Sequence, residues 1–410
     1  MKKHLLVISQ YFYPEQFRIN DLCQEWVKRG YEVTVVTGIP NYPAGKFYDG
    51  YGWFKRRKEE YEGIRIIRLP LIPRGHNGLM LALNYASFVV SGWFWSHFTR
   101  IKADKIFMFE VSPMTQALLG VWYKKRRKIP CYLYVQDLWP ENVEIVTGIH
   151  NKKIIHAIDK MVDYIYQNCN VIFATSPSFV KTIEERKSAW KVSGGKKKSK
   201  VVYWPQYAEE FYQPAKRESL TDMPENDRFK IVFTGNIGYA QGLDILPKTA
   251  AILKEKGICC DFVIIGDGRY RETLEQEISK ANVKEMFHLL GRKQPDQIPA
   301  YLAWCDAAFI SFADNPLFEK TIPAKLQSYM ACGMPILAAA SGETKRILKE
   351  AGAGLSCKIG NAEALAEKIV QMSRLKKEEL ETMGKNSLEY CRREFGKEML
   401  VGEMEKYLQR

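Results

Sequence analysis

Several signatures of well-known functional sites are missing from this sequence. Its nine cysteines form no C-x-x-C or C-x-x-H pair, so we expect reduced structural thiols in a cytoplasmic protein and no zinc site. The six histidines lie in no recognisable nucleophile context, which argues against a Ser-His-Asp triad. No D-x-D-type carboxylate cluster is present, and no repeat of solenoid length is visible.

The sequence also lacks a long, uninterrupted hydrophobic run. The apolar run near the N-terminus is too short for a signal segment, and we expect it to form a buried first strand. The longest apolar segment, residues 79–98, contains Asn84, several serines and His97, which makes it a poor membrane-spanning helix. We therefore expect a helix that is buried on a sheet, rather than one that dips into a membrane surface.

The composition is that of a soluble globular protein with an excess of positive charge. With 410 residues, we expect two domains of about 150–200 residues each. The formal charge of +14 indicates an anionic partner such as nucleic acid, anionic lipid or a phosphorylated substrate. Cations cluster at 55–58, 124–128 and 196–200, and the last cluster is most simply a solvated loop. Residues 50–58 (GYGWFKRRK) interleave aromatics with cations, which fits either a lipid headgroup layer or a solvated loop.

Short apolar runs alternate with amphipathic helical stretches through most of the chain. In the first half, the expected strands are 4–9, 32–37, 65–69, 105–109, 131–135, 171–174 and 200–203. In the second half, they are 230–235, 261–266, 287–291, 307–312, 335–340 and 354–358. Continuous apolar strands separated by helices predict parallel sheets that are covered on both faces.

This pattern predicts an α/β protein with two tandem doubly wound, Rossmann-like domains facing a cleft, with ligands at the carboxyl ends of the strands. The predicted N-terminal domain is 1–205, followed by a polar, proline-containing linker at 206–228. The predicted C-terminal domain is 229–375. The remaining residues, 376–410, are charged and helical and could pack back across the domain junction.

The segment 319–336 (EKTIPAKLQSYMACGMPI) is the most informative stretch of the chain. A charged loop leads into a short helix that stops at Gly333, and an apolar strand follows at once. Pro323 suits the first helical position, and Gly333 suits the left-handed residue just past the helix end. The helix start would carry partial positive charge and free N–H groups, with Lys320 and Lys325 beside it. This pattern fits a phosphate site, and it also fits a plain surface helix with incidental lysines.

Two further strand-to-helix turns are rich in glycine. The residues of interest are Gly235, Asn236, Gly238 and Gln241 in the first turn, and Gly266, Asp267 and Gly268 in the second. Glycine lets a backbone approach a phosphate closely, but any tight turn favours it, and neither turn is a G-x-G-x-x-G fingerprint. Together with the junction at Thr321, these turns would open at one sheet edge and surround a nucleoside diphosphate.

Seven segments spread along the chain form a specific combination, although each is weak alone. They are QYFYPE, YVQDLWPEN, ATSPSFV, FTGNIGYAQGLD, VIIGDG, LLGRKQPDQIPAYLAWCD and KLQSYMACGMPI. On these segments, nearly the whole chain resembles the retaining nucleotide-sugar glycosyltransferases of family four, which have the GT-B fold. Within that family it looks most like the bacterial subgroup that builds surface polysaccharides on lipid-linked acceptors. The resemblance implies an acceptor-binding first domain and a nucleotide-sugar-binding second domain.

The sequence departs from the family pattern where the donor would bind. Family members usually grip the diphosphate with an Arg and a Lys, and those positions are Asn236 and Gln241 here. Two Glu are also usual. The second position, expected to contact the ribose, is Ser328, and the first falls on Lys320, so that the neighbouring Glu319 becomes the candidate sugar-contacting or catalytic carboxylate. A diphosphate without cations is costly to desolvate. The candidate cations are therefore Lys325, Lys320, Arg292, Lys293 and, reaching across from the first domain, Arg18.

Carboxylates that follow strands of the first domain are candidate general bases. Asp137 and Glu141 follow the strand 131–135, and either could accept a proton from the acceptor hydroxyl. Asp137 could instead cap the next helix. Glu15 follows the first strand, on a loop that we expect to face the donor sugar. Family members often have His at the position of Gln136, and Gln cannot repeat proton chemistry done there.

The preferred interpretation is the transfer of a sugar from a nucleotide-sugar donor, with UDP as the expected carrier, to a polyprenyl-diphosphate-linked saccharide. The resemblance implies retention of configuration, and neither cofactor nor metal ion, because cations and a helix N-terminus would stabilise the leaving group. We expect a cytoplasmic protein in peripheral contact with the anionic inner membrane surface. The alternatives are a nucleotide-sugar epimerase of the same fold and a basic nucleic-acid-binding protein. No nucleic-acid-binding module is visible, so we expect no nucleic acid partner.

Overall fold

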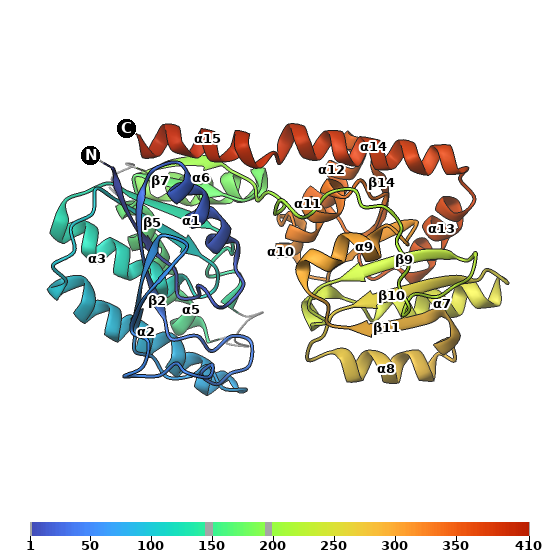
Figure 1. Cartoon of the computed structure of the whole chain (residues 1–410), viewed down its shortest axis with the longest axis horizontal. Helices are drawn as coiled ribbons and strands as arrows, with labels where there is room; N and C mark the ends of the chain where they lie inside the picture. The colour runs from blue at the N-terminus through green and yellow to red at the C-terminus, as the bar shows by residue number, and fades with distance from the viewer. Residues whose placement is uncertain (1, 144–150, 193–198, 410) are drawn as a thin grey trace. The chain divides into compact units, whose positions relative to one another are not determined.

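The computed structural model describes residues 2–143, 151–192 and 199–409, and the chain forms two compact units (Figure 1). The first unit is Met1–Trp204 with Tyr407–Arg410, and the second is Pro205–Lys406. The predicted linker 206–228 thus belongs to the second unit, where it forms no helix or strand. Residues 196–198 of the third basic cluster lie outside the described residues.

An eight-stranded sheet forms the centre of the first unit, in the order β3-β4-β2-β1-β5-β6-β7-β8. Its strands are β1 (His4–Ile8), β2 (Glu32–Gly38), β3 (Lys58–Tyr61), β4 (Ile64–Leu69), β5 (Lys105–Glu110), β6 (Cys131–Val135), β7 (Val171–Ala174) and β8 (Lys200–Tyr203). All seven strands predicted for this half are confirmed. Strand β3, which the sequence did not predict, is a half-exposed edge strand that pairs antiparallel to β4, and all the other pairs are parallel.

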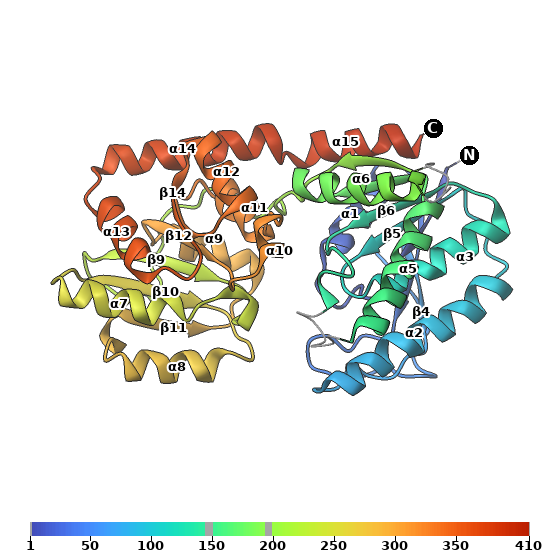
Figure 2. The ribbon, with the colours of Figure 1, turned by 180° about the vertical axis from the view of Figure 1, so that it is seen from behind.

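Helices cover both faces of this sheet. They are α1 (Arg18–Lys28), α2 (Gly78–Phe98), α3 (Ala117–Arg127), α5 (Lys152–Asn168) and α6 (Pro177–Val192), with a 3-10 turn η1 (Met114–Gln116) before α3. Helix α1 lies on one face, seen in Figure 1, and α5 lies on the other, seen in Figure 2. Apart from the connection between β2 and β4, which contains β3, the parallel crossovers pass through helices, and these helices bury the apolar strands on both sides.

Helix α2 differs from the helix expected for residues 79–98. One of its faces packs on the unit through Leu81, Asn84, Tyr85, Phe88, Gly92 and Ser96. The opposite face is exposed and carries Leu79, Leu83, Val90, Trp93, Phe94 and Phe98. The prediction of a buried helix is wrong for this second face, because α2 lies on the outside of the unit and nothing in the described chain covers it.

A six-stranded, fully parallel sheet forms the centre of the second unit, in the order β11-β10-β9-β12-β13-β14. Its strands are β9 (Phe229–Thr234), β10 (Cys260–Ile265), β11 (Phe287–Gly291), β12 (Ala307–Ser311), β13 (Ile336–Ala339) and β14 (Gly354–Cys357). All six predicted strands are confirmed. The order reverses between β9 and β12, which makes this a doubly wound sheet with a ligand-binding edge at the carboxyl ends.

The second unit has helices on both faces of its sheet (Figures 1 and 2). The longer helices are α7 (Ile245–Glu255), α8 (Arg271–Lys280), α11 (Ala324–Ala331), α12 (Gly342–Ala351), α13 (Ala362–Ser373), α14 (Lys377–Glu394) and α15 (Lys397–Leu408). The short ones are η2 (Tyr239–Gln241), η3 (Lys284–Met286), η4 (Pro295–Gln297), α9 (Ile298–Leu302) and α10 (Pro316–Glu319). Apolar side chains from β9, β10, α7, α8 and α13 form a continuous buried core.

The last two helices include residues of both units. Helix α14 contacts the end of α11, and Ser387 Oγ donates a hydrogen bond to Met334 O at 2.7 Å. The last turn of α15 belongs to the first unit, where Tyr407 O accepts a hydrogen bond from Tyr132 Oη at 2.8 Å and the Tyr407 ring packs on Phe173. The predicted C-terminal segment, 376–410, is therefore divided between the two units.

Candidate functional site

The predicted diphosphate site lies within the second unit, at the carboxyl edge of its sheet. Because all six strands are parallel, the loops that follow β9, β10 and β12 open at this edge. Backbone hydrogen bonds join the first two loops: Gly235 N donates to Ile265 O at 2.9 Å, and Ile237 N donates to Asp267 O at 2.9 Å. The structure therefore brings two of the three predicted turns side by side.

Backbone packing accounts for the glycines of the second turn. A Cβ atom at Gly266 would overlap Gly235 O, and one at Gly268 would overlap Ile237 O. Gly266 also has a φ of +147°, which L side chains rarely adopt. Ile237 N donates to Asp267 O at 2.9 Å, and the Asp267 side chain accepts from Gly268 N. These glycines are thus required for the close contact of two loops, whether or not a ligand binds there.

Helix α11 begins at Ala324, one residue later than predicted. Pro323 has a ψ of 141° and is the N-cap, so its assignment to the first helical position is wrong. Proline is tolerated at the N-cap because that residue is extended and its N–H takes no part in the helix. Pro323 O accepts the first helical hydrogen bond, from Leu326 N at 2.9 Å. Gly333 follows the C-cap residue with a φ of +68°, as predicted.

Lys325 lies in the first turn of α11 and points to the loop after β9. Its Nζ donates a hydrogen bond to Gln241 Oε1 and lies 3.9 Å from the centre of the Phe233 ring. The same Nζ is 4.0 Å from the place that a Cβ of Gly235 would occupy. Burial lowers the pKa of Lys325 to about 7, from an ordinary value of 10.5. The predicted residues Gly235, Gln241 and Lys325 therefore form one cluster beside a helix N-terminus.

Further contacts hold this cluster in place. Tyr329 Oη, one turn along α11, accepts a hydrogen bond from Thr234 N at 2.8 Å and so ties the helix to the end of β9. Ser311 Oγ donates to Gln241 O at 2.6 Å and ties the same loop to β12. Ser328 is buried, and its hydroxyl donates to Ala324 O within the helix. Asn236 is exposed, next to Gly238.

The other residues predicted to contact the donor differ in their exposure and in their partners. Thr321 Oγ1 donates to the carbonyl oxygen at the start of α10, at 3.1 Å. Glu319 is exposed at the end of α10, Lys320 is half-buried, and Arg292 is exposed after β11. Lys293 has a different partner from the one predicted: its Nζ forms an ion pair with Asp222 at 2.6 Å. That pair fastens the segment before β9 to the unit and compensates the lysine charge.

In the first unit, Asp137 lies at the carboxyl end of β6. Its Oδ2 accepts hydrogen bonds from Ser112 N and Ser112 Oγ, both at 2.8 Å. Within the described part of the chain, the carboxylate binds no backbone N–H of residues 138–143, so the N-cap alternative is wrong there. Burial raises the pKa of Asp137 above its ordinary value, and the two bonds from Ser112 oppose this shift.

Glu110 is a site residue that the sequence analysis missed. It ends β5, opposite the last residue of β6, and is fully buried. Its Oε2 accepts a hydrogen bond from Asp137 N, two residues after β6, at 3.4 Å. Its pKa is raised well above the ordinary value, first by burial and then by the Asp137 charge. The rule that identified Asp137 could have found it, because Glu110 is a charged residue that ends an apolar strand (KIFMFE) at the same edge.

Glu15 has a structural role in its loop. It is buried, and its Oε1 accepts hydrogen bonds from Asn41 N at 2.8 Å and Tyr42 N at 2.7 Å. Burial raises the pKa of Glu15 to about 7, although these bonds and Phe12 N oppose the shift. The carboxylate therefore organises the loop after β2, and the prediction that it faces the donor sugar is not supported by its contacts. Glu141 is exposed, and Arg18 is half-buried at the start of α1.

The described residues include no group of three or more His, Cys, Asp and Glu side chains that could hold a metal ion. Two groups of polar and charged residues are well defined at the carboxyl edges of the sheets. One is the Gly235–Gln241–Lys325 cluster of the second unit, and the other is the Glu110–Asp137 pair of the first. The former can bind an oxyanion, and the latter can hold or accept a proton.

Comparison with known families gives the same division of the chain. Residues 16–192 match the model described as "Glycosyl transferase 4-like domain", and residues 217–390 match the model described as "Glycosyl transferases group 1". The chain is 26% identical over 325 residues to the colanic acid biosynthesis glycosyl transferase WcaI of Escherichia coli strain K12, covering 75% of each. It is 25% identical over 147 residues to the amylovoran biosynthesis glycosyltransferase AmsK of Erwinia amylovora, covering 35% of this chain and 36% of AmsK.

Solved structures resemble the whole chain. The sucrose-phosphate synthase of Thermosynechococcus elongatus has a TM-score of 0.74 at 16% identity and covers 100% of this chain and 98% of its own. Anabaena HepE in complex with UDP-glucose has a TM-score of 0.66 at 16% identity and covers 99% of both chains. WaaG, a glycosyltransferase involved in lipopolysaccharide biosynthesis, has a TM-score of 0.65 at 13% identity and covers 98% of both chains. At this identity the likeness concerns the fold, and it confirms the expected GT-B class.

Proposed function

Because the chain belongs, through both of its domains, to the group 1 and type 4-like glycosyl transferases, we propose that it transfers a sugar from a UDP-sugar to a lipid-linked saccharide. The reaction would be one step in the biosynthesis of a bacterial surface polysaccharide, at the inner face of the cell membrane. The relative WcaI, whose name assigns it to colanic acid biosynthesis, supports a role in polysaccharide biosynthesis. The HepE structures with UDP and UDP-glucose support a UDP-sugar as the donor.

The observation that carries the proposal is the cluster of Gly235, Gln241 and Lys325 beside the start of α11. In the proposed complex, the glycine backbone allows a diphosphate oxygen to approach, and the helix N-terminus provides partial positive charge. Lys325 supplies a full positive charge, because an adjacent diphosphate favours its protonated form. This cation replaces the Arg and Lys expected at Asn236 and Gln241, so the proposed reaction needs neither a metal ion nor another cofactor.

We further propose that configuration is retained. The bond between the sugar C1 and the diphosphate oxygen breaks, and UDP leaves with the bonding electrons. The acceptor oxygen bonds to C1 on the same face, and its proton passes to a leaving-group oxygen or to a carboxylate of the acceptor-binding domain. Asp137 is the candidate carboxylate, since the hydrogen bonds from Ser112 fix its orientation and burial raises its pKa above the ordinary value.

An acceptor-dependence assay tests this function. Purified protein is incubated with a panel of UDP- and GDP-sugars, with and without a glycosylated polyprenyl diphosphate, and nucleoside diphosphate release is measured. We expect release only with the acceptor, and nuclear magnetic resonance of the product should show the anomeric configuration of the donor. Conversion of the nucleotide sugar without acceptor would instead indicate an epimerase, and no turnover across the panel would refute the proposal.

Substitution of Asp137 tests the assignment of the base. Asp137→Asn should lower kcat by about a hundredfold or more, which is the typical contribution of a general base. Donor affinity should not change, because the residue lies in the other domain. Glu184→Gln is the matched control, since Glu184 is a half-exposed carboxylate of α6 that forms an ion pair with Lys187. Equal kcat values for wild type and Asp137→Asn would remove Asp137 from the mechanism.

A further inference from the structure

Exposed apolar side chains are concentrated in one part of the first unit. Eleven large hydrophobic side chains are exposed among the described residues, and eight of them lie in only two segments. These eight are Trp53, Phe54, Leu79, Leu83, Val90, Trp93, Phe94 and Phe98, which we call the aromatic surface. Phe54 is 94% exposed and Phe98 is 72% exposed, so these rings are almost entirely open to solvent. A patch of this kind usually marks an interaction site.

On α2, the aromatic surface is a continuous stripe. Its residues on this helix lie at 79, 83, 90, 93, 94 and 98, and intervals of three, four and seven positions place most of them on one face. The face that packs on the unit contains Leu81, Tyr85 and Phe88 together with Asn84, Gly92 and Ser96, so both faces of α2 carry apolar side chains. A surface helix of a soluble protein instead has a polar outer face.

Specific contacts fix α2 in this orientation. Asn84 donates to Ile72 O at 2.6 Å and accepts from Gln10 Nε2 at 2.8 Å, both within the unit. A Cβ at Gly92 would overlap the Leu119 side chain, which shows how closely α2 and α3 pack. Rotation of the helix to bury its apolar stripe would break these contacts. By length and composition α2 could cross a membrane, but its packed face cannot also contact lipid.

The loop that bears Trp53 and Phe54 belongs to the same rigid part of the unit. The bridge between Gly52 and Lys55 makes a tight turn that presents both rings at its tip. Trp53 Nε1 donates to Leu71 O at 3.0 Å, and the next residue along, Ile72, donates from its backbone N to Ser87 Oγ on α2 at 2.9 Å. The two segments of the aromatic surface are therefore linked through residues 71–72.

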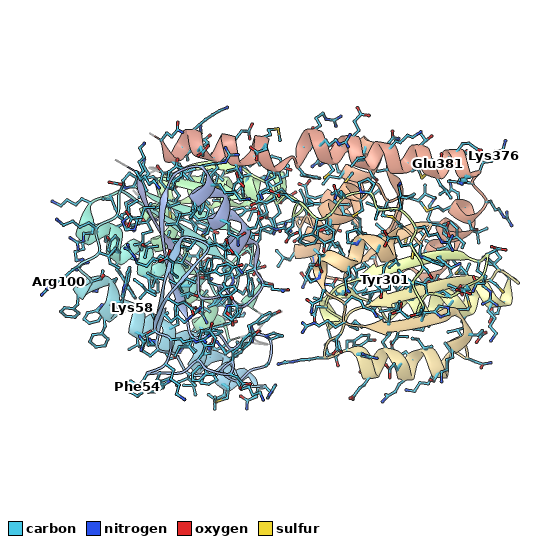
Figure 3. The ribbon with its side chains drawn as sticks, viewed as in Figure 1. Phe54, Lys58, Arg100, Tyr301, Lys376 and Glu381 are labelled. Atoms are coloured by element: carbon cyan, nitrogen blue, oxygen red, sulfur yellow. The ribbon has the colours of Figure 1, made fainter. Side chains whose placement is uncertain are left out.

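Cations flank the aromatic surface, and carboxylates are absent from its helix. Helix α2 contains no Asp, Glu, Lys or Arg. Lys55 and Arg56 follow Phe54 directly, and Arg100 and Lys102 follow the end of α2; all four are exposed. Figure 3 shows Phe54 and Arg100 at the outer edge of the unit, pointing away from it. Aromatic rings surrounded by basic residues match the headgroup layer of an anionic membrane.

We infer that the aromatic surface docks on an anionic lipid bilayer, with α2 lying in the plane of the interface. The rings would enter the boundary between headgroups and acyl chains, and the flanking cations would contact lipid phosphates. The inference rests on the proposed function only in one respect, namely that the lipid-linked acceptor would be found in the same membrane. Binding to lipid itself requires neither donor nor acceptor.

Vesicle sedimentation tests this docking. The full chain should bind vesicles of phosphatidylglycerol and bind vesicles of phosphatidylcholine at least about tenfold more weakly, with binding reduced by salt. The double variant Phe94→Ser/Phe98→Ser should bind phosphatidylglycerol about tenfold or more weakly than wild type. The matched control is Ile154→Ser, an exposed apolar residue of α5 outside the surface, which should bind like wild type. Circular dichroism and thermal melting verify that each variant is folded.

A second measurement uses the wild-type fold. Brominated phosphatidylglycerol should quench tryptophan fluorescence, and Trp93→Phe should reduce the quenching. Equal vesicle binding by the double variant and the control, or no binding by wild type, would overturn the inference. So would lipid-independent dimerisation that Phe94→Ser/Phe98→Ser abolishes, because the occupant would then be a second copy. Failure of the docking inference can be distinguished from failure of the proposed transfer reaction. The double variant should still turn over an acceptor that is dispersed in detergent, because that assay needs no membrane.

Discussion

Binding of a nucleoside diphosphate should load one proton onto Lys325. The structure lowers the pKa of this lysine to about 7 because its Nζ is buried against Phe233 and Gln241. At pH 8, only about a tenth of the free protein would carry the charge. An adjacent diphosphate stabilises the charged form and should return the pKa towards its ordinary range. Binding of UDP should therefore add about 0.8–0.9 proton to Lys325 at pH 8, against about 0.1 proton at pH 6, where the lysine is already mostly charged.

Titration calorimetry measures this proton uptake. The observed binding enthalpy is plotted against the ionisation enthalpy of the buffer, with Tris and Hepes at pH 8, and the slope is the number of protons taken up. UDP itself is fully ionised at this pH. Linkage also requires that affinity for UDP falls as pH rises, by about tenfold per unit between pH 7.5 and 9.

Two variants make this test specific. Lys325→Met keeps an apolar side chain against Phe233 but cannot take up a proton, so the slope should vanish and affinity for UDP should fall. Lys256→Met is the matched control, because Lys256 is an exposed lysine at the C-terminal end of α7, and it should behave like wild type. A slope near zero in the wild type, or an unchanged slope in Lys325→Met, would refute the placement of the diphosphate at this lysine.

Three further predictions concern stability and pH. Gly266→Ala should destabilise the protein by about 3 kcal/mol or more in urea unfolding, because the new Cβ would overlap a neighbouring carbonyl oxygen. Gly257→Ala, where φ is also positive but no atom lies within 4 Å, should cost only about 1–2 kcal/mol, and equal losses would contradict the packing argument. Glu110→Gln should leave the acid limb of the kcat profile in place, because burial and the Asp137 charge keep Glu110 uncharged while Asp137 titrates; a limb that moves to lower pH would show that Glu110 carries a charge there. Glu15 has a folded pKa of about 7, above its ordinary 4.5, so stability should fall as pH rises from about 4.5 to 7, by up to about 3 kcal/mol, and Glu15→Gln should flatten that dependence in urea unfolding curves across this range.

The fold could be predicted from the sequence because it depends on local pattern. Continuous apolar runs bounded by helices specify parallel strands, and all thirteen of these strands are present. Gly333 was predicted correctly, since the residue after a helix end requires a positive φ that glycine adopts most easily. The edge strand β3 was missed because its charged residues, Lys58–Tyr61, have no apolar run, and their pairing with β4 depends on a distant segment.

The candidate site could be predicted only in outline. The sequence indicated Gly235, Gln241 and Lys325 because each follows a strand or begins a helix at the same sheet edge. It did not indicate that they contact one another, or that Lys293 is compensated by Asp222. Those facts depend on which loops approach each other across the sheet, and residues far apart in sequence supply them.

The sequence by itself determined the two doubly wound domains and the sheet edge at which we expect ligands, because strands and helix ends follow from periodicity and local backbone preference. Tertiary structure alone decided the electrostatic state of the site and the outer surface. The pKa of Lys325 depends on burial by distant residues. The exposure of Trp93 and Phe94 depends on which face of α2 packs on α3, and a helix that is apolar all around gives no local signal of that choice.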